Sequence, residues 1–405
     1  MKKAVFGIVL FILILGVYLL RRPDAEILSG DLGFLNTPDG FKISVAAKDL
    51  DGPRVIIFDS AGRMLVSETK AGRVSILEDV DKNGNFENQI TLIENLKSPH
   101  GLDFYTDPKT KTTYLYIAET HQVARYPYDV KTGKITDKTG QNIANLPADG
   151  QHFTRTISFG PNFRASAIVG GSIDTLAETK LYISVGSSCD VCEETTWKRA
   201  AILETDPEGT YTAEFAGGLR NSVFFAFHPI TKEIWATEMG RDNLGDNLPP
   251  DEINIVKVAG PEDKFGAKRY GWPFCYGKKI QDKKFNPEKW ERIDLTNDCH
   301  NTKEPVIEMQ AHSAPLGLAF IPSGKGWPKD WEGDLLVALH GSWNRSEPVG
   351  YKIVRYDLDA KGKVLSSEPK DFVSGGRPVD LKFGLDGVLY VSDDAAGLIY
   401  RISIN

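Results

Sequence analysis

The same pattern of strands recurs six times along this chain. In residues 218–256 it begins at a loop tip with Arg220 and Asn221, continues as an apolar strand and a His228–Pro229 turn, and ends with two further strands. The other copies begin at Arg54, His100, Arg155, Pro315 and Pro378. A unit that repeats its turn chemistry at intervals of about 40–90 residues is typical of a β-propeller whose blades carry insertions. The pattern therefore predicts an all-β fold, a six-bladed β-propeller over residues 37–405.

Composition agrees with one closed propeller. A chain of 405 residues would ordinarily suggest two or three domains, but propeller blades bury their faces on one another and need no division. The 38 glycines and 22 prolines suit many tight turns, and the 20 phenylalanines and 14 tyrosines suit short strands. The net charge of -7 argues against nucleic acid as a partner.

The first 22 residues differ sharply from the rest. Lys2 and Lys3 precede an uncharged, almost entirely apolar stretch, residues 4–20, and Arg21–Arg22 follow it. Such a segment is typical of a signal peptide or a signal anchor. Because no Ala-x-Ala site follows, an uncleaved hydrophobic anchor helix is favoured, with residues 23–36 as a polar tether. We therefore expect an extracytoplasmic protein, periplasmic or at the cell surface, attached to the membrane through residues 4–20.

Four cysteines bear on the same question. Cys189 and Cys192 form a short C-x-x-C, while Cys275 and Cys299 lie further apart. An even number of cysteines in an exported chain favours disulfides, and the expected pairs are Cys189–Cys192 and Cys275–Cys299. A zinc site is the alternative, with His300 as the adjacent candidate ligand.

Loops that lead into the inner strands of a propeller converge on the channel mouth, where such folds place their sites. His152 lies in one of these loops, and a single histidine there fits a structural role as well as a catalytic one. His100 opens another inner strand and either faces the central pocket or caps the strand through a hydrogen bond. The sequence therefore leaves two roles open for each of these histidines, and only their surroundings can decide which role each one has.

Three arginines stand at equivalent loop positions of different blades. Arg220 follows Gly218–Leu219, Arg345 ends the Trp343–Asn344–Arg345 run after a strand, and Arg377 opens the sixth inner strand. Their spacing predicts a ring of positive charge around one mouth of the channel. Such a ring would suit an anionic ligand.

A loop at the end of the first blade imitates a calcium site. Asp79, Asp81, Asn83 and Gly84 match the start of a calcium-binding loop, but its twelfth position is Ile90 where a glutamate is needed. A solvated turn is therefore the favoured interpretation.

Several motifs together resemble those of a known family. They are GQHFTRTISFGP, SVGSSCDVCEE, GLRNSVFFAFHP, MGRDNLGDNLPPDEIN, YGWPFCYG, AHSAPLGLAF, ALHGSWNRS and GRPVDLKFGLDG. In this order they resemble the glucose/sorbosone dehydrogenase family, six-bladed propellers that depend on pyrroloquinoline quinone (PQQ), and in particular its sorbosone dehydrogenase-like branch. The resemblance runs from Gly40 to Ile404.

The resemblance implies roles for seven residues. His152 falls where the family has its general base, which takes a hydroxyl proton while hydride passes to the quinone. Arg220 and Asn221 match the pair that hydrogen-bonds the reactive carbonyl of the cofactor, and Arg377 and Arg345 match basic contacts to the cofactor. Gly240 and Arg241 match positions whose backbone carbonyls bind a calcium ion, Ca2+. The implied partners are a sugar substrate and a downstream electron acceptor, a quinone or a cytochrome.

Two positions depart from the family pattern. Gln151 stands where the glucose-oxidising members carry an acidic residue, and Glu252 aligns near a structural calcium ligand whose companion ligands are not recognisable. The substrate is therefore open between an aldose and a sugar aldehyde. Two other classes compete with the dehydrogenase: a non-catalytic propeller that serves as a binding module, and a calcium-dependent hydrolase of the lactonase type, which would need several carboxylates around one metal.

Overall fold

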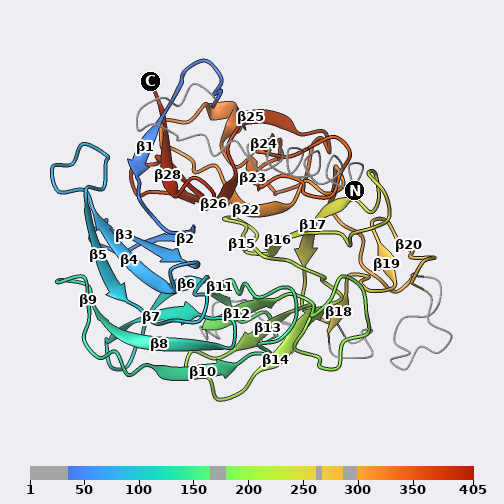
Figure 1. Cartoon of the computed structure of the whole chain (residues 1–405), viewed down its shortest axis with the longest axis horizontal. Helices are drawn as coiled ribbons and strands as arrows, with labels where there is room; N and C mark the ends of the chain where they lie inside the picture. Colours follow the sequence, from blue (N-terminus) through green and yellow to red (C-terminus); the bar gives the residue numbers. More distant parts are fainter. Residues whose placement is uncertain (1–34, 165–178, 261–266, 286–298) are drawn as a thin grey trace, which may run out of the picture. The chain divides into compact units, whose positions relative to one another are not determined.

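Six antiparallel sheets stand around a common centre in the computed structural model (Figure 1). The structure describes residues 35–164, 179–260, 267–285 and 299–405. In every blade the first strand contacts the first strand of at least one neighbouring blade. This arrangement confirms the six-bladed propeller predicted from the repeats.

Strands β1 to β14 form most of blades one to three. Blade one comprises β2 (Pro53–Phe58), β3 (Met64–Glu68), β4 (Arg73–Glu78) and β5 (Asn88–Ile93). Blade two comprises β6 (Leu102–Thr106), β7 (Thr113–Ala118), β8 (Gln122–Asp129) and β10 (Gln141–Asn145), with the short β9 (Lys134–Ile135) paired to β8. Blade three comprises β11 (Ile157–Pro161), β12 (Thr179–Val185), β13 (Ala201–Thr205) and β14 (Ala213–Gly217), extended by β18 (Lys268–Arg269).

The later strands form the other three blades. Blade four comprises β15 (Phe225–Phe227), β16 (Ile234–Glu238), β17 (Asp251–Val256) and β21 (Ile307–Met309), and a separate hairpin joins β19 (Cys275–Tyr276) to β20 (Ile280–Gln281). Blade five comprises β22 (Pro315–Phe320), β23 (Leu335–Leu339), β24 (Lys352–Tyr356) and β25 (Lys370–Ser374), with a 3-10 helix η2 (Lys329–Trp331) between its first two strands. Blade six comprises β26 (Pro378–Phe383), β27 (Leu389–Asp393), β28 (Leu398–Ile404) and β1 (Phe41–Ala47).

The first and last strands of the propeller close it. β1 pairs antiparallel with β28, from Phe41 opposite Ile404 to Ala47 opposite Ile399, and Figure 1 shows the blue strand beside the red one. This confirms the expectation that the early strand closes the ring beside the C-terminal one. A sheet completed from both ends of the chain leaves no unpaired edge between the first and last blades.

Adjacent blades approach closely at their inner strands. A Cβ on Gly101, just before β6, would lie 2.6 Å from the Arg155 carbonyl oxygen, and one on Gly317 in β22 would lie 2.6 Å from that of Val379. Only glycine allows this backbone separation. Buried carboxylates also join blades, since Asp103 accepts the Phe159 N–H and Asp380 accepts the Ile56 N–H, both at 2.8 Å.

Both expected disulfides are present. Cys189 is bonded to Cys192, and Cys275 to Cys299, so the zinc alternative for these four cysteines is wrong. In the calcium-like loop, the Asp79 and Asp81 side chains accept backbone N–H groups of the turn itself, as a solvated turn requires.

The predicted signal or anchor, residues 1–22, and nearly all of the predicted tether lie outside the described residues. The last two tether residues are described: Leu35 is buried, and Asn36 exchanges two backbone hydrogen bonds of 3.0 Å with Ser374. These contacts extend the propeller two residues further toward the N-terminus than predicted. Within the described ranges, no helix has the length and apolar character needed to cross a bilayer.

Candidate functional site

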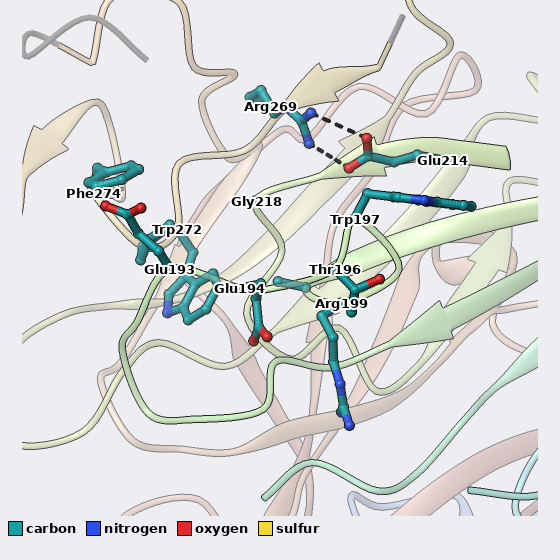
Figure 2. Close-up of a pocket in the computed structure, with 12 residues that line it drawn as sticks. Glu193, Glu194, Thr196, Trp197, Arg199, Glu214, Gly218, Arg269, Trp272 and Phe274 are labelled. Atoms are coloured by element: carbon teal, nitrogen blue, oxygen red, sulfur yellow. Dashed lines mark hydrogen bonds and ion pairs between the residues drawn. The ribbon is translucent and has the colours of Figure 1, made fainter. Parts of the chain in front are cut away.

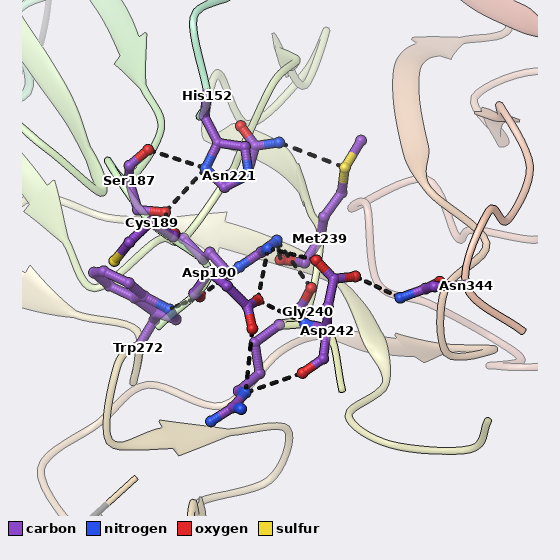
Figure 3. Close-up of polar contacts among 12 residues, drawn as sticks. His152, Ser187, Cys189, Asp190, Asn221, Met239, Gly240, Asp242, Trp272 and Asn344 are labelled. Atoms are coloured by element: carbon purple, nitrogen blue, oxygen red, sulfur yellow. Dashed lines mark hydrogen bonds and ion pairs between the residues drawn. The ribbon is translucent and has the colours of Figure 1, made fainter. Parts of the chain in front are cut away.

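The candidate site lies where the loops of blades three and four meet (Figure 3). His152 precedes β11, while Arg220 and Asn221 lie between β14 and β15. Gly186, directly after β12, separates them, and a Cβ there would lie 2.6 Å from both the Asn221 Oδ1 and the His152 Cβ atoms. Glycine at this position therefore allows the predicted base and the predicted amide to converge.

The surroundings of His152 determine which of its ring nitrogens carries a hydrogen. Its Nδ1 atom lies 3.0 Å from the Ser187 carbonyl oxygen and 2.9 Å from the Ser187 hydroxyl. A carbonyl oxygen only accepts, so Nδ1 carries the hydrogen in the neutral ring and Nε2 keeps its lone pair. Burial, and then the positive charge of Arg220, lower the pKa of His152 to about 3. The imidazole is therefore neutral at ordinary pH.

Arg220 is the centre of the polar network. Its Nε donates to the Asp190 carbonyl at 2.9 Å, and its Nη1 to the carbonyls of Met239 and Gly240 at 3.4 and 3.0 Å. Its Nη2 donates to the carboxylates of Asp190 and Asp242 at 2.9 and 3.1 Å. A guanidinium has five N–H groups, and these five contacts match them one for one. Arg220 thus contributes a fixed positive charge, and its donors are committed to the protein.

The sequence patterns had not singled out the two carboxylates that hold Arg220. Asp190 lies inside the Cys189–Cys192 disulfide loop, where its carboxylate also accepts the Asp242 N–H at 2.7 Å. Asp242 in turn accepts the Asn344 amide at 2.5 Å, which brings blade five into the network. Burial raises the pKa of Asp242. The position of Asp190 between two bonded cysteines was the one signal in the sequence that could have indicated it.

A further buried acid positions Asn221. The Glu238 carboxylate, at the end of β16, accepts the Asn221 backbone N–H at 2.9 Å and the Ser222 hydroxyl at 2.5 Å. Burial raises the pKa of Glu238 to about 8. The Asn221 side chain itself contacts only a weak acceptor within this network, the Met239 sulfur at 3.5 Å, so its amide can bind a ligand.

The two predicted calcium positions belong to the same network. The Gly240 carbonyl accepts Arg220 and so uses one of its two lone pairs, and its N–H is bound by Asp251 at 3.0 Å. The Arg241 guanidinium pairs with Asp282 at 2.9 Å. Within the described ranges, sets of three close metal-binding side chains occur elsewhere, at Cys189–Cys192–Glu194 and Asp79–Asp81–Glu87. A cation at Gly240 would therefore need backbone carbonyls and oxygens of its ligand.

The structure brings five of the seven predicted residues together, whereas Arg345 and Arg377 make their contacts with other residues. Arg345 donates to the carbonyls of Asp246 and Ala311, so it joins the blade-four loop beside Asn344. Arg377, before β26, stacks on Tyr351 with its guanidinium carbon 5.3 Å from the ring centre. The contact from Arg377 Nη2 to the Tyr351 hydroxyl is long, at 3.4 Å. The guanidinium N–H groups of Arg377 are therefore largely available to a ligand.

His100 belongs to the core. It is fully buried, its ring centre lies 5.2 Å from that of Phe224, and its Nδ1 lies 3.3 Å from the Thr156 hydroxyl. Burial, and then the charge of Arg54, lower the pKa of His100 well below its usual value. Of the two roles left open by the sequence, the hydrogen-bonded structural one fits these contacts.

We expect His100→Leu to remove part of the acid sensitivity of the fold. The folded histidine resists protonation, whereas the unfolded one takes a proton below a pKa of about 6.5. The wild type therefore loses stability as pH falls through 6.5, on the order of 2 kcal/mol at pH 5 from this group. Urea unfolding at pH 7 and pH 5 measures the loss in both proteins. Equal losses in wild type and variant would show that His100 does not titrate in this way.

Comparisons with known proteins extend over the whole propeller. The family model described as TrAA12-like matches residues 35–405. An uncharacterized protein of Borreliella burgdorferi is 31% identical over 381 residues, which is 91% of this chain and 90% of that protein. The pyrroloquinoline quinone-dependent pyranose dehydrogenase of Coprinopsis cinerea is 26% identical over 91% of this chain, which spans 54% of that enzyme's length.

A solved structure agrees on the fold. The calcium structure of the Trichoderma reesei carbohydrate-active enzyme of family AA12 matches with a TM-score of 0.73, over 92% of this chain and 97% of that one. The two sequences are 23% identical, so the match concerns the architecture of the blades.

Proposed function

The chain belongs to the TrAA12-like family, and from this membership we propose that it is a quinoprotein dehydrogenase that oxidises an aldose or a sorbosone-like sugar aldehyde with pyrroloquinoline quinone. The observation that carries the proposal is the neutral His152 imidazole beside Asn221 and the fixed charge of Arg220. A base, an amide donor and a cation close together suit an oxidation in which a hydroxyl group loses its proton and the carbon that bears it loses a hydride.

The residues present suit such a cofactor. Its carboxylates call for cations with free N–H groups. Arg377 offers most of its guanidinium, and Arg345 offers Nη2, the nitrogen that its three contacts to backbone carbonyls leave free among the described residues. The Asn221 amide could donate to the quinone carbonyl, and the Gly240 and Arg241 carbonyls would be calcium ligands beside it. When bound, the quinone supplies the hydride acceptor.

His152 would then move one proton. Its Nε2 lone pair would take the hydroxyl proton of a sugar hemiacetal or hydrated aldehyde as the carbon loses hydride, and Ser187 would hold the ring through Nδ1. Because its pKa is low, His152 is a weak base, so the proton would leave the hydroxyl together with the hydride rather than before it. The charge of Arg220 would stabilise the negative charge that develops on the acceptor.

The proposal has a cellular part. The apolar stretch at residues 4–20 supports export and attachment to the membrane, and the two disulfides support an oxidising compartment. In that setting the electron acceptor of the proposed reaction would be a membrane quinone or a cytochrome.

Titration with pyrroloquinoline quinone tests the proposal directly. We expect the full-length protein to bind it more tightly with calcium than without, and to reduce a dye when aldoses or sugar aldehydes are added. Arg377→Ala should weaken quinone binding about tenfold, the loss of one charge-assisted contact. Arg401→Ala, on the outer part of blade six, is the control and should bind as wild type does. No binding by the wild type would favour the non-catalytic propeller instead.

A further inference from the structure

We propose that a second pocket, on the far side of Trp272 from Arg220, binds an additional sugar unit, so that the substrate is a disaccharide or longer saccharide. This inference rests on the proposed function. The pocket lies between residues 193–200 and the loop around Trp272, over the ends of blade three (Figure 2). Its cavity volume is about 80 Å³ and it opens to solvent, so a sugar ring would lie partly inside it and partly at its mouth.

Aromatic rings form opposite walls of this pocket. Figure 2 shows Trp197 on one side and Trp272 with Phe274 on the other. Trp197 is 37% exposed, so part of its ring is open to a ligand. The face of an indole ring is apolar with a negative surface, and it suits the polarised C–H groups on the face of a pyranose ring.

Carboxylates supply the polar part of the pocket. Glu193, Glu194 and Glu214 all line it, and ionised carboxylates only accept hydrogen bonds. These carboxylates therefore favour a ligand that brings several O–H donors, as a sugar does. Two arginines in the same lining, Arg199 and Arg269, offset two of the three negative charges, so the pocket suits a neutral ligand better than a small cation.

The carboxylates are held in place before any ligand arrives. Arg269 donates from Nη1 and Nη2 to the two carboxylate oxygens of Glu214, at 2.5 and 3.2 Å. Glu194 accepts the Ser188 N–H at 2.5 Å and its hydroxyl at 2.9 Å. Each of these carboxylate oxygens keeps a further lone pair for a ligand hydroxyl. Groups fixed in this way bind at a lower entropic cost than free side chains.

Shared residues connect this pocket to the candidate catalytic site. Trp272 donates its indole N–H to the Asp190 carbonyl at 3.1 Å, and Asp190 holds Arg220. Arg199 donates to the His152 carbonyl at 3.3 Å from the other side. One layer of side chains therefore separates the pocket from the predicted base. A saccharide that presents one unit to His152 and places a neighbouring unit between the tryptophans would have to pass over the edge of this layer.

Binding of maltose and of glucose to the full-length protein, without added quinone, tests the inference apart from catalysis. We expect maltose to bind at least tenfold more tightly than glucose by calorimetry. Trp197→Ala should abolish this preference, and Glu193→Gln should reduce it. Tyr211→Ala removes an aromatic residue of similar exposure, 39%, outside this pocket and should leave the preference unchanged.

Each outcome decides one of the two proposals. Equal binding of maltose and glucose, or an unchanged maltose affinity in Trp197→Ala, would overturn the second sugar site. If maltose binds through Trp197 but quinone does not bind, the pocket stands and the dehydrogenase proposal fails. With quinone bound, we expect Trp197→Ala to lower kcat/KM about tenfold for maltose and to leave it unchanged for glucose.

Discussion

Replacement of His152 by alanine is expected to lower kcat for sugar oxidation by about 10²–10⁴-fold, the usual contribution of a general base. In the wild type the Ser187 carbonyl holds the hydrogen on Nδ1, so the Nε2 lone pair is free to accept a proton. The alanine variant loses this lone pair. Quinone binding should change little, because the imidazole makes no contact with Arg345 or Arg377 in the described residues. Steady-state dye reduction with saturating quinone measures the effect.

The control separates the base from a general loss of structure. His300 is exposed, and His300→Ala should keep the turnover of the wild type. Turnover by His152→Ala within a few-fold of wild type would show that another group removes the proton. Loss of quinone binding together with turnover would assign His152 a structural role, the alternative that its sequence position allowed.

The pH dependence gives a second measure of the same residue. Because the pKa of His152 is lowered to about 3, its neutral form persists well below the ordinary histidine pKa. The rate should therefore show no decline near pH 6.5 as the solution is acidified from pH 7 to pH 5. The opposite result would be a wild-type rate that falls near pH 6.5 while the rate of an active variant at position 152 does not. That result would show that the bound cofactor restores an ordinary pKa to His152.

The blades could be predicted because their sequence signal is local and repeated. Each copy carries its own apolar strands and turn, so the closure of β1 on β28 followed once the copies had been counted. Boundaries were less certain. The apolar strand expected directly after Arg220 and Asn221 begins only at Phe225, because the Val223 N–H turns back to the Asn221 carbonyl at 3.0 Å.

The site could be predicted only in part because its contacts join irregular loops. His152, Arg220 and Gly240 were found from motifs, yet Asp190 and Asp242 were not, since the direction of a loop carboxylate depends on its tertiary neighbours. Trp272 was recognised only as part of the YGWPFCYG motif. Its indole N–H reaches across to Asp190, in a segment 82 residues away in sequence, and no local pattern carries that information.

Removal of Arg220 should have the largest effect on stability of any change in the site. The side chain is 5% exposed and pairs with Asp190 and Asp242, so Arg220→Ala removes the cation that the two carboxylates share and leaves only Arg241, 3.9 Å from Asp190. Breaking a buried pair of this kind typically costs about 3–5 kcal/mol, and the partial exposure of both partners favours the lower value. Urea unfolding with the purified protein measures the change.

Two further variants separate charge from geometry. Arg345→Ala removes an arginine that contacts backbone carbonyls and no carboxylate among its described partners, so it should cost less than about 1 kcal/mol. Arg220→Lys keeps the positive charge, but lysine has three N–H donors for the five acceptor contacts that Arg220 makes. It should therefore recover only part of the stability that Arg220→Ala loses. If the lysine variant is as stable as wild type, the charge alone matters. If Arg220→Ala is also as stable, the network around Asp190 does not hold the loops of blades three and four together, and the fixed cation proposed for catalysis loses its structural basis.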